Sequence, residues 1–337
     1  MPTTKKASWA QSLVLFFVLL LSSISSGQAQ TFGVAGTPIS TVEDRNYEGV
    51  FRALRNSGVD TYFPTFQYQE VPEPLSFGFE TDFLPPCTAD DPGFRALRST
   101  GMKLIVPGEL IYPDPSILTR DAKSEDPLAQ IIECAGPDGV AAITNYDEAV
   151  LNGRPIQDVA ALYEHLKSVA PNLPVLMVHG PIVADRPEFS RPDLIETYLQ
   201  RVQAFSEFAD VVGFDVYPFP AFLMQLATPS SGGMIVEEAR VVEEYLTWIG
   251  DVLPRKSKLI VLQGFALTDL YDPDFLESNF SADLLATVAA PANGEIQMMV
   301  KQAKAHDAEF IFWWGGAALK SADDPPWPSI LGAASTR

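Results

Sequence analysis

Short apolar segments alternate along the chain with segments whose apolar residues follow the helical period. The run KLIVLQG at 258–264 is continuously hydrophobic, as expected of a strand buried on both faces of a parallel sheet. Between such runs, Val159, Leu162 and Leu166 mark one helical face, and Pro155 suits a helix start. The pattern predicts eight strands, at residues 31–36, 59–66, 103–107, 140–144, 175–179, 211–216, 258–264 and 308–314.

Eight strands that alternate with helices predict the α/β class and, within it, a (β/α)8 barrel, the TIM-barrel fold. An open, doubly wound sheet is the main alternative, and it usually carries a glycine-rich phosphate loop after its first strand. The corresponding segment here reads GTPIS and lacks the GxGxxG spacing. Because the sequence shows no linker, internal repeat or low-complexity tract, we expect residues 30–337 to form a single barrel domain.

Residues 1–29 have the pattern of a secretory signal peptide. Lys5 and Lys6 precede an apolar run at 13–21, and the small residues Gly27 and Ala29 fit a cleavage site near Ala29. The apolar run is shorter than the roughly 20 residues of a spanning helix; an uncleaved membrane anchor is the alternative. We therefore expect a secreted or periplasmic protein with no stable membrane insertion after cleavage.

The composition is strongly acidic, with a formal net charge of −20. Phosphate binding requires a cationic face, so this balance argues against nucleic acid or an anionic membrane surface as a partner.

Cys87 and Cys134 are the only cysteines. Export would permit a disulfide, but two free buried thiols are equally compatible with the sequence. Three histidines without HExxH-like spacing predict no zinc site, and we expect no cofactor. The oligomeric state is not indicated.

The ends of the predicted strands carry carboxylates, amides and aromatic rings. In a (β/α)8 barrel, the carboxyl ends of the strands and the loops that follow them build the site. Aromatic faces pack against the C–H faces of sugars, and carboxylates and amides bind hydroxyl groups, so this mixture predicts a carbohydrate ligand. Which glycan is bound is not indicated. The candidates are Tyr62, Glu109, Asn145, Asp147, Glu148, His179, Asp215, Tyr217, Gln263, Trp313 and Trp314.

Four motifs fall at these strand ends: NYDE at 145–148, DVVGFDVYPFP at 210–220, VLQGF at 261–265 and FIFWW at 310–314. Together they resemble the motifs of the glycoside hydrolase TIM barrels of the clan that includes cellulases and β-galactosidases, and most closely its poorly characterised, hydrolase-like relatives. In that clan an Asn-Glu pair ends strand four, with the Glu as general acid/base, and a Glu that ends strand seven is the nucleophile. The resemblance implies Glu148, or Asp147, as the acid/base. It places Gln263 at the position of the nucleophile.

An amide such as Gln263 cannot form a glycosyl ester, so another carboxylate must complete the reaction. Asp215 is the first choice and Glu109 the second; the strand spacing is compatible with either a retaining or an inverting pair. The sequence therefore predicts a glycosidase in which Glu148 is the acid and Asp215 its partner. The alternatives are a catalytically silent carbohydrate-binding barrel and a metal-dependent hydrolase that uses Asp147, Glu148 and Asp215.

Several of these residues also have a purely structural interpretation. Asp147 and Glu148 are suited to the start of the following helix, because acidic side chains favour helix N-termini. His179 and Gln263 are compatible with ordinary buried packing. Since successive side chains of a strand point in opposite directions, one of Trp313 and Trp314 is expected to face the barrel mouth and the other the helices.

Overall fold

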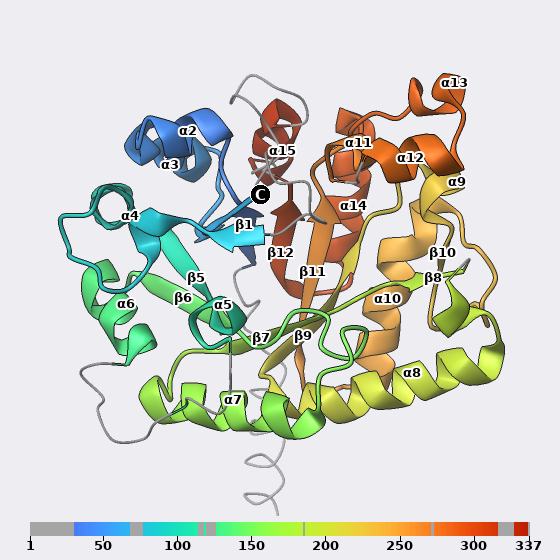
Figure 1. Cartoon of the computed structure of the whole chain (residues 1–337), viewed down its shortest axis with the longest axis horizontal. Helices are drawn as coiled ribbons and strands as arrows, with labels where there is room; N and C mark the ends of the chain where they lie inside the picture. The colour runs from blue at the N-terminus through green and yellow to red at the C-terminus, as the bar shows by residue number, and fades with distance from the viewer. Residues whose placement is uncertain are drawn as a thin grey trace, which may run out of the picture.

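The structure is a computed structural model that describes residues 30–67, 77–113, 118, 126–184, 186–270, 273–315 and 327–335. Within them, eight parallel strands close into a barrel in the order β1-β12-β11-β9-β7-β6-β5-β2, and helices surround it (Figure 1). The predicted single-domain (β/α)8 barrel is therefore confirmed. The predicted signal peptide, residues 1–29, lies outside the described residues.

The barrel strands are β1 (Thr31–Ala35), β2 (Thr61–Phe63), β5 (Lys103–Pro107), β6 (Val140–Thr144), β7 (Val175–His179), β9 (Val211–Val216), β11 (Ser257–Gln263) and β12 (Ala308–Trp314). Each overlaps one predicted strand, and the second is the one that differs most. It ends before Pro64, because proline has no N–H to donate to a strand ladder. The chain then forms β3 (Thr65–Gln67), which pairs with β4 (Phe77–Phe79) outside the barrel.

The helices cover the outside of the barrel. Proline opens α4, α6 and α8, where the missing N–H would have no helical partner in any case. In the described residues no helix has both the length and the apolarity to cross a membrane. The helices are α2 (Ile39–Glu43), α3 (Tyr47–Asn56), α4 (Pro92–Thr100), α5 (Gly108–Ile111), α6 (Pro127–Ala135), α7 (Ile156–Val169), α8 (Pro192–Phe205), α9 (Ala221–Met224), α10 (Glu238–Val252), α11 (Leu267–Leu270), α12 (Pro273–Asn279), α13 (Ala282–Leu285), α14 (Asn293–Ala305) and α15 (Trp327–Ala334).

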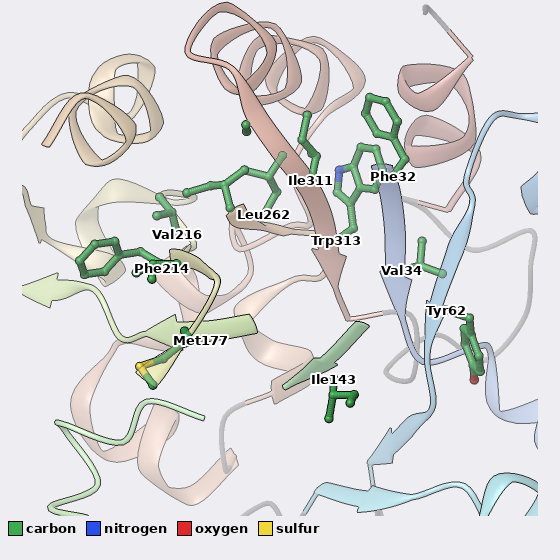
Figure 2. Packing of buried hydrophobic residues seen from close by; sticks show 14 of the residues in the cluster. Phe32, Val34, Tyr62, Ile143, Met177, Phe214, Val216, Leu262, Ile311 and Trp313 are labelled. Atoms are coloured by element: carbon green, nitrogen blue, oxygen red, sulfur yellow. The ribbon is translucent and has the colours of Figure 1, made fainter. Parts of the chain in front are cut away.

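The apolar core has two parts, one on each face of the barrel strands. The outer part lies between strands and helices, and Figure 2 shows Phe32, Phe214 and Trp313 within it. The rings of Phe32 and Trp313 stack with their centroids 5.8 Å apart. The inner part fills the barrel with Ile105, Ala142, Leu176, Val211, Leu259, Val261, Phe310 and Phe312. This inner layer forms a solid base beneath the carboxyl ends of the strands.

A disulfide joins Cys87, which lies before α4, to Cys134 in α6, with the two Cα atoms 6.3 Å apart. That separation lies in the usual range for a disulfide. Of the two states that the sequence left open, the structure therefore has the bonded one. The bond ties the chain that follows β4 to the helix that precedes β6.

Candidate functional site

A cavity of about 260 Å³ lies at the carboxyl ends of the barrel strands. Inner-core residues such as Leu176, Leu259 and Val261 form its base. Its wall holds four carboxyl groups, from Glu109, Asp147, Glu148 and Asp215, and the aromatic side chains of Phe63, Tyr146, Tyr217, Phe312 and Trp314. The cavity therefore combines ionisable groups with ring faces in one enclosed space.

Glu148 and Asp215 form a carboxyl pair in direct contact. Glu148 follows β6 and Asp215 belongs to β9, and both strands pair with β7. The two side chains are hydrogen bonded to each other, and burial is the largest cause that raises the pKa of each. The contact raises the pKa of Asp215 further and opposes the rise for Glu148. Two carboxyls this close cannot both ionise cheaply, so the contact disfavours the doubly ionised state of the pair.

The main chain and its neighbours fix the position of Glu148. Its φ is 42°, a left-handed conformation that costs energy for a residue with a side chain. Its N–H donates to the carbonyl of Val178 over 3.1 Å. Gly180 lies against the carboxyl group, since a Cβ at this glycine would be 2.5 Å from Glu148 Oε1. The hydroxyl of Tyr198 donates to the Gly180 carbonyl over 2.6 Å, and the exposed Arg186 favours the ionised form of Glu148.

Glu109 and Asp147 lie next to each other at the wall of the cavity. Glu109 lies in α5, directly after β5, and its Oε2 accepts a hydrogen bond from the Asp147 N–H at 2.9 Å. Burial raises the pKa of Glu109, while this hydrogen bond and the charge of Arg154 oppose the rise. Asp147 retains an exposed surface, yet enclosure by the cavity wall, followed by the charges of Glu109 and Glu148, raises its pKa. Of these two groups, Glu109 has the stronger interactions that favour the ionised form.

Asn145 holds the loop that carries Asp147 and Glu148. Its Nδ2 donates to the carbonyls of Val159, at 3.2 Å, and Phe208, at 3.1 Å, and its Oδ1 accepts from the Tyr146 N–H at 2.8 Å. Asn145 lies at the cavity wall, but its amide hydrogen bonds go to the main chain. The Arg154 guanidinium packs 4.4 Å from the centre of the Tyr146 ring. These contacts anchor the acidic loop on both sides.

Gln263 ends β11 but does not line the cavity. Its fully buried side chain accepts from the Phe219 N–H at 2.9 Å and donates to the carbonyls of Phe219, at 2.7 Å, and Phe265, at 3.0 Å. It thus ties the loop after β9 to the end of β11. A carboxylate could accept one of these hydrogen bonds but could not donate the other two, which explains why an amide occupies this strand end.

The remaining predicted site residues divide between the two faces of the barrel wall. Tyr217 and Trp314 line the cavity, whereas Trp313 packs in the outer core. Tyr62 also belongs to the outer core (Figure 2). Its hydroxyl donates a hydrogen bond to Glu80. His179 is fully buried, with Nε2 3.1 Å from Ser206 Oγ, and burial lowers its pKa to about 3. It is therefore neutral and outside the cavity wall.

Sequence reasoning missed Phe63, Arg154 and Gly180. Phe63 immediately precedes Pro64, and this proline is the one signal in the sequence that marks it as the strand end. For the metal-dependent alternative, the described part of the chain contains no group of three His, Cys, Asp or Glu side chains placed to hold a metal ion.

No protein-family model and no curated protein matches the sequence. Solved structures do share the fold. A GH53 catalytic domain from Ignisphaera aggregans aligns over 93% of this chain and 97% of its own, with 15% identity and a TM-score of 0.51. A putative α-L-fucosidase from Bacteroides thetaiotaomicron aligns over 90% of this chain and 90% of its own, with 11% identity and a TM-score of 0.52. A class V chitinase from Pseudomonas fluorescens aligns over 90% of this chain and 99% of its own, with 11% identity and a TM-score of 0.50. At such identities, the similarity establishes a common barrel.

Proposed function

We propose that the protein is a glycan hydrolase whose general acid is Glu148, with its protonated form favoured by burial of the side chain. The observation that carries this proposal is the buried pair of Glu148 and Asp215, whose carboxyl groups contact each other in a cavity that also presents aromatic rings. A sugar ring stacked on an aromatic face would bring its glycosidic oxygen to the carboxyl groups. The barrel shared with several glycoside hydrolases supports the same function.

A general acid must hold a proton at working pH and donate it to the oxygen of the leaving group. Burial of Glu148 favours the first condition, because desolvation raises the pKa of this carboxyl group more than Asp215 and Arg186 lower it. When the proton moves to the glycosidic oxygen, the bond between that oxygen and the sugar carbon breaks. The nearby charge of Arg186 then offsets part of the negative charge that remains on Glu148.

The second carboxylate in this proposal is Glu109. Opposed carboxyl groups of glycosidases lie about 5–9.5 Å apart, whereas Asp215 touches Glu148, so Asp215 suits the role of proton partner better than that of nucleophile or base. Glu109 comes from a different strand end and receives both a main-chain N–H and the charge of Arg154. These interactions favour the carboxylate that must activate water or attack the sugar. Asp147 lies next to it and orients it through the main chain.

A silent carbohydrate-binding barrel is the second candidate, and the position of Gln263 favours it. The end of β11 carries this amide instead of a carboxylate. Its oxygen and nitrogen are both hydrogen bonded to main-chain groups, so the end of β11 offers no nucleophile or base. Binding of sugars would then rely on the aromatic rings and the carboxyl groups without turnover.

The test is release of reducing ends from a panel of polysaccharides by the parent protein and by Glu148→Gln. Loss of a general acid lowers turnover by about 10²–10⁴-fold, and Glu109→Gln should lower it as well. Glu164→Gln, at an exposed position of α7, is the matched control and should keep parental turnover. Equal turnover of Glu148→Gln and the control would refute the assignment of the acid. Binding without release by the parent protein would support the silent barrel.

Export of the protein is part of the same proposal. The disulfide between Cys87 and Cys134 supports an oxidising compartment, where such bonds persist. Mass spectrometry of the protein recovered from the periplasm or medium should show an N-terminus near Gln30. Recovery of the intact leader from membranes would contradict it.

A further inference from the structure

The polar groups of the cavity wall are unusually rich in hydrogen-bond acceptors. Four carboxyl groups line it, and no Lys, Arg or His lies among the described residues of the wall. An ionised carboxylate accepts hydrogen bonds but donates none. The amide donors of Asn145 are already used by main-chain carbonyls. A ligand that brings donors and a positive charge would therefore complement the carboxyl groups of this wall.

One of these acceptors is buried without a partner. Oδ1 of Asp215 is inaccessible to solvent and makes no hydrogen bond to any described residue, although its residue lines the cavity. An unsatisfied buried acceptor is destabilising, and more so when it is charged. A positively charged ligand in the cavity would offset part of this cost through its charge, without contact to this enclosed oxygen. Arg154 and Arg186 offset part of the charge of the carboxyl groups, but neither lines the cavity.

Aromatic rings stand opposite the acidic loop. In the closed strand order β12, which carries Trp314, lies four places from β6, which precedes Glu148. The rings of Trp314 and Phe63 have their centroids 6.1 Å apart, and Tyr217 lines the same cavity. Ring faces attract ammonium groups through their electron density, and they also pack against sugar C–H groups. The wall therefore pairs aromatic faces with carboxylates, a combination that suits a cation.

We infer that the substrate or ligand is a glycan of amino sugars with free ammonium groups. An ammonium group offers three donors and a positive charge, and no described residue of the cavity wall carries a positive charge. A neutral sugar offers hydroxyl groups but no charge to balance the carboxylates, and an acidic sugar is repelled. This inference rests on the proposed function and specifies the substrate class of the same site.

A matched series of ligands isolates the ammonium group. The β-1,4-linked hexamers of glucosamine, N-acetylglucosamine and glucose differ only in the group at C2, and galactosamine and galactose monosaccharides repeat the comparison in the other ring configuration. Binding is measured by calorimetry for the hexamers and by saturation-transfer NMR for the monosaccharides, at about pH 6, where the amine is protonated. We expect each ammonium sugar to bind at least about tenfold more tightly than its hydroxyl counterpart, the size of one charge-assisted hydrogen bond.

Two variants separate the cavity from the overall charge of the protein. The net charge of −20 would attract any cation weakly. Glu109→Gln should lower the preference for ammonium over hydroxyl sugars by about fivefold or more, whereas the surface control Glu164→Gln should leave it unchanged. An equal preference in both variants would assign the effect to the surface and overturn the inference.

The ligand series also keeps this inference distinct from the proposed function. Cleavage or binding of glucose or N-acetylglucosamine hexamers in preference to glucosamine hexamers would overturn the amino-sugar assignment and leave the hydrolase in place. No binding and no cleavage of any glycan in the series or in the polysaccharide panel would overturn both.

Discussion

Gln263→Glu places a carboxylate at the end of β11, the position that the sequence resemblance assigns to a nucleophile. The structure predicts that it damages the fold instead of creating a catalytic group. The parent amide donates to the carbonyls of Phe219 and Phe265 and accepts from the Phe219 N–H, and it is fully buried. The introduced carboxyl group keeps the accepted bond. When protonated, it restores only one of the two donations.

The expected cost has two parts. One buried carbonyl loses its donor, which costs about 1–3 kcal/mol. The carboxyl group must also stay protonated at pH 7, against a usual pKa of about 4.3, at about 1.4 kcal/mol for each pH unit, or roughly 4 kcal/mol. The free energy of unfolding should therefore fall by about 6 kcal/mol at pH 7. Because the second part vanishes near pH 4, where the unfolded chain is also protonated, the loss there should shrink to about 2 kcal/mol.

The assay is urea or thermal unfolding at pH 7 and pH 4, with Gln203→Glu at an exposed position of α8 as the control. At about 2 °C for each kcal/mol, the Tm of Gln263→Glu should lie about 12 °C below that of the parent at pH 7 and about 4 °C below it at pH 4. Stability equal to that of the control at pH 7, or a gain of hydrolytic activity, would refute the structural role of Gln263.

Three further predictions concern the support of the site and the fold. Gly180→Ala places a Cβ 2.5 Å from Glu148 Oε1, so turnover should fall at least about tenfold while the Tm drops by only a few degrees; parental turnover would contradict the packing argument. Burial raises the pKa of Glu80 to about 8, so the folded protein keeps a proton that the unfolded chain releases above about pH 4.5. The free energy of unfolding should therefore fall as the pH rises from about 4.5 to about 8. Denaturation of Glu80→Gln should show a free energy of unfolding that depends less on pH over the same range. Double replacement Cys87→Ser and Cys134→Ser opens a link between residues 47 positions apart and should cost about 4 kcal/mol in urea unfolding, as should reduction of the parent.

The barrel could be predicted from the sequence because runs such as KLIVLQG permit burial on both faces, and eight of them alternate with helical patterns. The side on which a given ring lies was harder to predict, because it depends on the residue at which a strand ends. Strand β2 ends at Phe63, so Phe63 faces the cavity and Tyr62 faces the helices. A shift of one residue reverses such an assignment.

The gathering of carboxyl groups could also be predicted, but their pairing could not. Strand ends placed Glu109, Glu148 and Asp215 at one edge of the barrel, and the cavity brings them together. The contact between Glu148 and Asp215 depends on the left-handed backbone conformation of Glu148, which no local sequence pattern specifies. The amides were ambiguous for a related reason: Asn145 hydrogen bonds to carbonyls contributed by distant segments, and the sequence does not show which segments approach it.

The pairing of β1 with β12 makes the cavity a late product of folding. Thr31 lies opposite Phe310, so the ring of strands cannot close until nearly the whole chain has been synthesised. Before that moment β1 and β11 each have an unpaired edge, and open edges of this kind recruit strands from other chains. The same last strand delivers Trp314 to the cavity. A nascent chain that stops short of β12 therefore lacks a finished binding surface and is exposed to aggregation, and protection by chaperones matters most just before completion.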